Sequence, residues 1–321
     1  MTLSRVGVCV LALLALSAST SWGEERYALL ISGASGSPEY AQQHQRWRES
    51  MRQVLVDRLH VAPTAVVVLG EKAEGTTLAT RDNVRAAFAD LKNRMKPVDL
   101  LLVVLFGHGT FDGVDAKFNL VGPDLDTAEW KALIGGVPGH VVFVNTTSAS
   151  FPFLERLSGS NRIVITATDS EAQKYQTVFP EFFAKAFDDE AADLDKDGRV
   201  SLWEAFVYTA AAVKTWYEQR GQLSTERALL DDNGDGVGRH AGEVTKDGAV
   251  ASRTFLDASA DGTASTDPEL ADLIGQRNQL EGDLDELKRK RQFMPPGDYE
   301  RELERIAVAI SRVSRRIRTK S

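Results

Sequence analysis

The strongest chemical signal in the sequence is an acidic segment whose oxygen-bearing residues recur at the spacing of a metal-binding loop. An EF-hand loop takes its ligands from its first, third, fifth, seventh, ninth and twelfth positions, which here are Asp193, Asp195, Asp197, Arg199, Ser201 and Glu204. Gly198 permits the sharp turn, Arg199 offers its backbone carbonyl, and Glu204 can close the site with both carboxylate oxygens. The segment predicts bound Ca²⁺; the alternative is a solvated acidic loop with accidental spacing.

A second acidic loop repeats only the opening of this scheme. Asp231, Asn233 and Asp235 stand at the first, third and fifth positions, but Gly242 occupies the twelfth and Glu243 follows one residue late. Asn-Gly and Asp-Gly pairs are also ordinary turn formers. The sequence therefore leaves two interpretations open, a degenerate second calcium site and a simple turn.

A histidine and a run of hydroxyls could carry acid–base or nucleophilic chemistry. His108 stands between glycines directly after an apolar run, where an imidazole can act as a general base or acid. A second apolar run is followed by hydroxyls that include Thr147 and Ser148, and a hydroxyl beside a histidine is the minimum for nucleophilic catalysis. No acidic residue is obviously placed to orient the imidazole. The alternatives are a histidine bonded to its own loop, and Ser148 or Ser150 capping a short helix over 151–157.

The elements that position these residues follow an alternating pattern. Short apolar runs alternate with amphipathic stretches from residue 24 to about residue 187, which predicts a mainly parallel sheet covered by helices. The candidate strands are 27–32, 65–69, 99–106, 140–145 and 162–168. They are rich in Val, Ile and Leu without alternation, as expected where both faces are buried. Because ligands of such sheets bind at the carboxyl ends of strands, functional residues should cluster just after Phe106 and Val144.

Three further regions follow this predicted α/β domain. Residues 188–248 form an acidic, EF-hand-like region around one long helix over 201–220, and residues 249–267 are small and polar enough for a flexible linker. Residues 268–321 carry two heptad-spaced apolar stripes on either side of a Pro-Pro-Gly segment at 294–298, which predicts an antiparallel helical hairpin. The stripes need a partner surface, either each other or a second chain, so a homo-oligomer is one expectation.

The hairpin is basic, whereas the whole chain is acidic. Residues 285–321 hold eleven Lys or Arg against six Asp or Glu, a net charge of +5, while the whole chain carries −8. This asymmetry favours docking of the hairpin on an acidic surface, either the calcium-binding region of the same chain or another subunit. The alternative is a solvated coiled-coil exterior, since surface ion pairs contribute little. The acidic chain disfavours nucleic acid as the main partner.

The N-terminus has the pattern of a signal peptide over residues 1–23. An apolar run over 6–17 is followed by small residues up to Gly23, where cleavage is expected. The run is shorter than the roughly 20 residues of a bilayer span, and nothing later is apolar enough to span. We therefore expect an exported protein, periplasmic or secreted, whose single cysteine, Cys9, is removed with the signal peptide. The mature chain would then have no disulfide and no cysteine nucleophile.

The surroundings of His108 and of the hydroxyl run resemble the caspase and legumain group of peptidases. In that group one apolar strand ends in His-Gly, as at His108-Gly109, and the next strand ends at the catalytic cysteine. The strand from Ile163 to Thr168 completes the likeness, which covers roughly 26–187. The Asp-Asp-Asn-Gly-Asp-Gly loop and helical tail are similar to exported bacterial proteins placed beside the legumains. The resemblance implies a caspase-like α/β/α sandwich with a His-Cys dyad that cuts peptide bonds.

In this sequence a hydroxyl stands at the cysteine position of the resemblance. That position falls on Thr147, or on Ser148 if the register shifts by one, and a hydroxyl needs a well-placed base where a thiol of pKa about 8.5 does not. This departure from the group's pattern therefore predicts a pseudopeptidase that keeps its cleft for a peptide or protein ligand. A hydrolase that uses Thr147 or Ser148 with His108 is the alternative, and a calcium-dependent scaffold is a third interpretation.

Overall fold

The computed structural model describes the body of the molecule and part of its C-terminal tail. The described residues are 24–72, 76–171, 173, 175–243, 247–257, single positions between 273 and 291, and 294–319. The predicted signal peptide, 1–23, lies outside them. No helix within these ranges is both long and apolar enough to cross a membrane.

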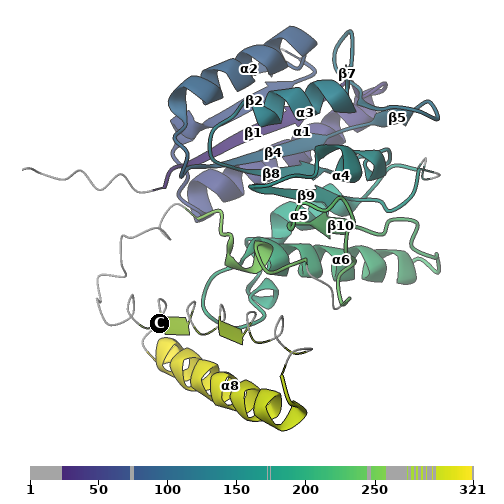
Figure 1. Cartoon of the computed structure of the whole chain (residues 1–321). Coiled ribbons are helices and arrows are strands. Elements are labelled where there is room, and N and C mark those ends of the chain that lie inside the picture. Colours follow the sequence, from purple (N-terminus) through teal and green to yellow (C-terminus); the bar gives the residue numbers. More distant parts are fainter. Residues whose placement is uncertain are drawn as a thin grey trace, which may run out of the picture.

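A seven-stranded sheet forms the centre of the molecule (Figure 1). Its strands, in their order across the sheet, are β10 (Leu229–Asp231), β9 (Arg162–Thr166), β8 (His140–Asn145), β4 (Leu100–Phe106), β1 (Arg26–Ser32), β2 (Val66–Gly70) and β3 (Thr77–Leu78). All neighbours pair in parallel except β10, which runs antiparallel to β9. The two central strands, β1 and β4, are buried along their whole length, because helices cover both faces.

The helices make this an α/β/α sandwich, as the sequence predicts. One face carries α2 (Arg81–Arg94), α3 (Thr127–Gly135) and α4 (Phe151–Leu157), and the other carries α1 (Pro38–Gln53), α5 (Phe179–Ala186) and α6 (Leu202–Glu218). Shorter helical segments are a π-helical turn, Val54–Arg58, and 3-10 turns at Pro63–Ala65, Glu190–Ala192 and Ala251–Arg253. Under the α2 to α4 layer, Trp130 packs edge-on against Phe88, Phe118 and Phe143, which fixes that layer on the sheet.

A small antiparallel sheet follows β4 at the carboxyl edge of the main sheet. It consists of β5 (Gly109–Phe111), β6 (Ala116–Phe118) and β7 (Leu125–Asp126). The chain passes from β4 to β5 through Gly107, whose φ of +142° is a conformation that favours glycine. This turn directs β5 toward the end of β8, which matters for the candidate site.

The predicted elements agree with the structure within a few residues, with one larger difference. The strand predicted over 162–168 ends at Thr166, and the helix predicted over 201–220 spans Leu202–Glu218. The region 188–248, however, is not a separate unit. It supplies α6 to one face of the sandwich and β10 to the edge of the main sheet.

The predicted flexible linker, 249–267, is folded onto the body in its first part. Phe255 forms an isolated bridge with Ser201, and Arg199 pairs with Asp257 over 2.8 Å. The prediction of flexibility is therefore wrong as far as Asp257, because side-chain and backbone bonds hold this stretch beside the acidic loop. The rest of the predicted linker lies outside the described residues.

The tail forms the antiparallel hairpin that its heptads predict. Its second helix, α8, spans Pro296–Arg318 and begins at the predicted Pro-Pro-Gly break. Leu273 and Leu280 of the first helix pack with Val313 and Ile317 near the end of α8. The two apolar stripes therefore contact each other.

Candidate functional site

His108 follows β4 at the carboxyl edge of the sheet, where the sequence predicts functional residues. Its half-buried ring lies against two rings of α1, with centroids 4.8 Å from Tyr40 and 5.1 Å from His44. Burial lowers the pKa of His108, and a hydrogen bond with the backbone of Ser35 partly offsets this effect. The imidazole is therefore mainly neutral at pH 7, the state that a general base requires.

The two predicted nucleophiles differ in exposure. Thr147, beyond the end of β8, is 1% exposed, and its hydroxyl oxygen is buried without a hydrogen-bond partner within the described part of the chain. Gly109 of β5 covers it, because a Cβ added at Gly109 would lie only 2.7 Å from Thr147 Oγ1. Ser148, the next residue, is half-buried. The hydroxyl at the cysteine position of the resemblance is therefore the less accessible of the two.

The other hydroxyls of this run tie the ends of neighbouring strands together. Thr146 Oγ1 donates to the carbonyl of Leu105 over 2.6 Å, and the hydroxyls of Ser150 and Thr168 are 2.9 Å apart. Ser150 stands at the N-cap of α4, but its side chain makes no capping bond and instead accepts from the amide of Thr168. Ser150 is thus at the predicted capping position without the capping bond, because its backbone is helical (φ −78°, ψ −30°) and not extended as in a typical N-cap.

His44, which no sequence motif marks, is buried on α1 beside His108. His44 is 1% exposed, and neither ring nitrogen has a partner among the described residues. Burial, and then the neighbouring His108, lower the pKa of His44 to about 4 against a smaller opposing effect of Glu71. The helical spacing back from Met51 and Trp47 would have placed His44 on the buried face of α1.

A polar hollow of about 130 Å³ opens beside His44 at the end of β1. Arg48, which is 8% exposed, donates to Ser32 Oγ over 2.5 Å. Glu71 accepts from the hydroxyl of Ser35 over 2.6 Å. Helix α1 and the residue after β2 thus bring two opposite charges to the same hollow as His44.

The acidic loop 193–204 has the turn geometry that its sequence predicts. Ligand oxygens of Asp193, Asp195 and Asp197 all lie within 4.8 Å of one another. Asp193 accepts from the amides of Asp197 and Gly198 over 3.1 and 2.9 Å, and Gly198 has a φ of +87°. Burial, and then the nearby Asp197, raise the pKa of Asp195 to about 6. The carboxylates therefore repel one another, and a cation between them would relieve that repulsion.

Glu204, the predicted closing ligand, has other partners in the structure. Its carboxylate accepts from the amides of Leu194 and Ser201 over 2.8 and 2.9 Å, and it completes a capping box at the start of α6 with Ser201. The Ser-x-x-Glu spacing of these two residues fits such a box as well as the ninth and twelfth positions of an EF-hand loop. The structure thus gathers three of the six predicted ligands and assigns Ser201 and Glu204 to the helix start. The guanidinium of Arg199 pairs with Asp257.

A positively charged side chain lies in the opening of this loop. Arg277, from the first helix of the hairpin, places its guanidinium nitrogens 2.6 Å from Asp197 Oδ2 and 3.5 Å from Asp195 Oδ2. The Arg277 side chain is only 4% exposed. The hairpin therefore contacts the acidic loop of the same chain through Arg277, a residue outside the segment 285–321 whose charge predicts docking.

The second acidic loop repeats hydrogen bonds of the first. Asp231 accepts from the amide of Gly236, Asn233 from that of Asp235, and Asp235 from that of Val237. The same first-to-sixth, third-to-fifth and fifth-to-seventh bonds occur in the first loop. The repetition shows a shared turn, which both the calcium interpretation and the simple-turn interpretation accommodate.

Two further buried carboxylates lie at this second loop. Asp232 accepts from the amides of Val250 and Ala251 over 2.8 and 2.7 Å, and Asp247 accepts from the amide of Asp232 over 3.2 Å. Burial, together with the charges of Asp232 and Asp231, raises the pKa of Asp247 to about 6. The bonds of Asp232 to Val250 and Ala251 fasten the described part of the predicted linker to the body.

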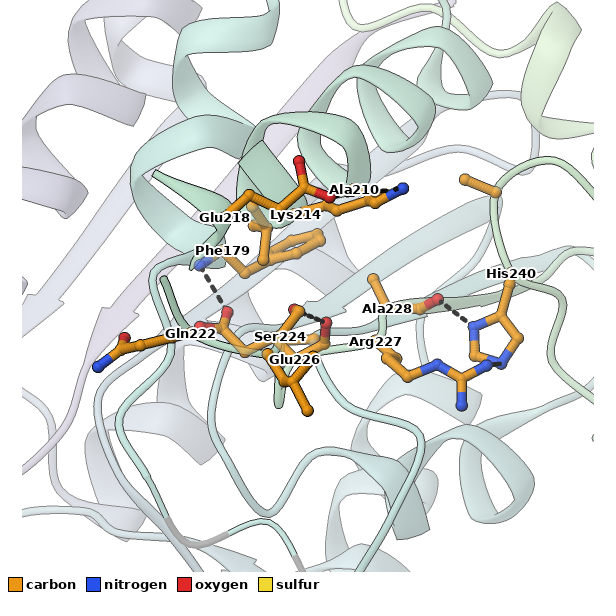
Figure 2. A pocket seen from close by; sticks show the side chains of 14 residues that line it. Phe179, Ala210, Lys214, Glu218, Gln222, Ser224, Glu226, Arg227, Ala228 and His240 are labelled. Atoms are coloured by element: carbon orange, nitrogen blue, oxygen red, sulfur yellow. Dashed lines mark hydrogen bonds and ion pairs between the residues drawn. The ribbon is translucent and has the colours of Figure 1, made fainter. Parts of the chain in front are cut away.

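A hollow of about 330 Å³ lies beyond the end of β9, between α5, α6 and the segment that leads into β10 (Figure 2). Phe179 and the exposed Lys214 are among its lining residues. Beside Phe179, the carboxylate of Glu226 accepts from the amides of Val178 and Phe179 and from the hydroxyl of Tyr217. Glu226, although distant in sequence, therefore accepts the hydrogen bonds of amides at the N-terminus of α5.

No family model and no curated protein matches the chain. Among solved structures, it is similar to a structural-genomics protein of Geobacter sulfurreducens, with 15% identity, a TM-score of 0.42, and coverage of 69% of this chain and 95% of that chain. It is also similar to caspase-1 from Spodoptera frugiperda, with 8% identity, a TM-score of 0.42, and coverage of 65% of this chain and 86% of that chain.

Proposed function

We propose that this protein is an exported, calcium-binding module with a caspase-like body that binds a peptide or protein without cutting it. The burial of Thr147 carries the non-catalytic part of the proposal. The hydroxyl at the cysteine position of the resemblance is 1% exposed and lies under Gly109. A substrate carbonyl could reach it only if β5 moved away. His108, which would have to activate that hydroxyl, packs instead against Tyr40 and His44.

Two hollows at the carboxyl edge of the sheet support the binding part of the proposal. Ligands of parallel sheets bind at this edge, and binding sites combine apolar walls with a few polar groups. The hollow beyond β9 offers Phe179 and Val213 together with charged side chains such as Lys214 and Arg227. A peptide side chain with an apolar stem and a charged end has the matching chemistry.

The geometry of the loop 193–204 supports calcium binding. Three carboxylates converge, and amide bonds already hold the turn in shape. We assign the opening ligands to Asp193, Asp195 and Asp197, with the Arg199 carbonyl and Ser201 following. Glu204 would complete the site by exchanging its amide partners for the ion.

The full chain is expected to remain unlabelled by a fluorophosphonate probe and to cleave no member of a peptide library. The physical reason is that Thr147 is buried and its hydroxyl has no hydrogen bond to His108. Ser148 is half-buried and is the reachable hydroxyl, so Ser148→Ala and His108→Ala are the informative variants. Ser252→Ala, an exposed serine in a 3-10 turn, is the control. Labelling that is lost in both informative variants but kept in the control would establish the hydrolase alternative.

Millimolar Ca²⁺ is expected to raise the melting temperature of the full chain by roughly 5–10 °C. Ligand at about 100 times its Kd adds about 2.7 kcal/mol, and 1 kcal/mol shifts Tm by about 2–4 °C in a body of this size. Glu204→Gln should remove most of this increase yet keep the capping box, because glutamine also serves at that position. Calorimetry with Ca²⁺ or with a chelator measures both effects.

The matched control for this experiment is Glu181→Gln, since Glu181 is also a first-turn glutamate, on α5. Its calcium response should equal that of the native chain. A melting curve of the native chain that is the same in chelator and in Ca²⁺ would contradict the assignment of a calcium site.

Export and self-association complete the proposal. The signal-peptide pattern of residues 1–23 supports export, and N-terminal sequencing of the protein secreted by its host would detect cleavage near Gly23. The exposed Val308 on α8 supports a homo-oligomer formed through the hairpin. Light scattering of the full chain would measure the oligomeric state.

A further inference from the structure

We propose that Arg277 acts as an internal substitute for the metal ion, and that Ca²⁺ entering the loop 193–204 displaces it and releases the hairpin from the body. This inference rests on the calcium part of the proposed function and adds its regulation. The consequence would be a tail that is docked without calcium and free with calcium.

The inference rests on which carboxylate oxygens of Asp195 and Asp197 Arg277 contacts. Asp195 Oδ1 accepts from the amide of Asp197, and Asp197 Oδ1 accepts from the amide of Arg199, so these two oxygens belong to the turn itself. The second oxygen of each carboxylate, Oδ2, is the one that Arg277 contacts. Because a bound ion would need those same outward oxygens, Arg277 and Ca²⁺ cannot hold them together.

The charges favour the ion when it is present. Three convergent carboxylates face one guanidinium, whose nitrogens lie 3.5 Å from Asp195 Oδ2 and 2.6 Å from Asp197 Oδ2. A single positive charge therefore leaves the cluster incompletely neutralised. A divalent ion supplies twice the charge at the same place, with a coordination geometry that suits carboxylate oxygens.

The hairpin has a core of its own, which would allow it to leave as a unit. Leu273, Leu280, Val313 and Ile317 form an apolar cluster that is separate from the core of the body. Arg277 lies one helical turn after Leu273, at the place in the heptad stripe where an apolar residue would continue the seam. Arg277 thus replaces an apolar contact within the hairpin by an ion pair with Asp197 of the body.

Distance measurement between two spin labels tests the release directly. In the full chain with Cys9→Ser, labels are attached at Val98→Cys and Val308→Cys, which are 53% and 41% exposed in the native protein. A single narrow distance distribution is expected in chelator, and a shifted or broadened one in millimolar Ca²⁺, with Mg²⁺ as the ion control. An unchanged distribution under conditions where calorimetry shows bound Ca²⁺ would overturn the inference and leave the calcium site standing.

Calcium affinity tests the competition without relying on the labels. Arg277→Gln is expected to tighten the apparent Kd for Ca²⁺ by about tenfold or more, because a site that is mostly occupied by its own side chain binds in proportion to its free fraction. Arg312→Gln, on the exposed side of α8, should leave the Kd unchanged. Equal affinities of the native chain and Arg277→Gln would overturn the inference. Absence of calcium binding in both would overturn the proposed calcium site and the inference with it.

Discussion

Replacing Glu226 with alanine is expected to lower the free energy of unfolding by about 2–4 kcal/mol, because several buried donors lose their shared acceptor. Those donors are the amides of Val178 and Phe179 and the hydroxyl of Tyr217, at 2.8 to 3.0 Å from the carboxylate. Glu226 is 4% exposed, so water cannot easily replace it. Urea unfolding at pH 7 measures the change.

Two variants separate this effect from a general loss of acidic residues. Glu218→Ala removes an exposed glutamate that lines the same hollow and pairs with Lys214 over 3.7 Å, and it should change stability by less than about 0.5 kcal/mol. Tyr217→Phe removes one of the donors, so its loss of stability should lie between those of Glu226→Ala and Glu218→Ala. A Glu226→Ala protein as stable as Glu218→Ala would show that α5 does not depend on this acceptor.

Acidification from pH 7 to about pH 4 is expected to destabilise the body by up to about 3 kcal/mol through His44 alone. The pKa of His44 is lowered from 6.5 in the unfolded chain to about 4 in the folded one, chiefly by burial and then by His108. Between these values the unfolded state binds the extra proton, so stability is complete above pH 6.5 and is lost as pH falls. Glu71 opposes the shift, and His108 adds a loss of the same sign.

The variant His44→Phe should flatten this part of the pH profile. Phenylalanine fills the aromatic position beside Trp47 without a group that must be protonated on unfolding. His140→Gln changes an exposed histidine at the start of β8 and should leave the profile as it is. Denaturant unfolding at several pH values between 4 and 7 compares the three proteins. If the stability of His44→Phe depends on pH in the same way as that of the native protein, His44 is not the source of the acid destabilisation.

The sheet and its carboxyl edge could be predicted because they depend on local patterns. Strands that are buried on both faces appear in the sequence as unbroken apolar runs. The end of the run at Phe106 is therefore sufficient to place His108 at the carboxyl edge of the sheet. The acidic loop was equally readable, since its amide bonds connect residues that are close in sequence. Strand β10 was not predicted, because its three residues are too few to show a period.

The remaining features depend on partners that are distant in sequence. Arg277 and Asp197 are 80 positions apart in the sequence. The charge asymmetry of the tail predicts docking, but it does not identify Arg277 as the side chain that enters the loop. Glu226 and Val178 are 48 positions apart. The burial of Thr147 follows from the path of β5 over the end of β8, which no single segment specifies.

The outermost strands of the main sheet are also its shortest, with two residues in β3 and three in β10. A long exposed edge presents a row of free amides and carbonyls to which strands of other molecules can add, and short edges are one way in which proteins prevent such aggregation. The described sheet therefore offers little template for edge-to-edge polymerisation or for an extended peptide that binds as an additional strand. Side-chain surfaces at the carboxyl edge and along the hairpin, where specificity is set by shape and charge, are therefore better suited to recognition than the edges of this sheet.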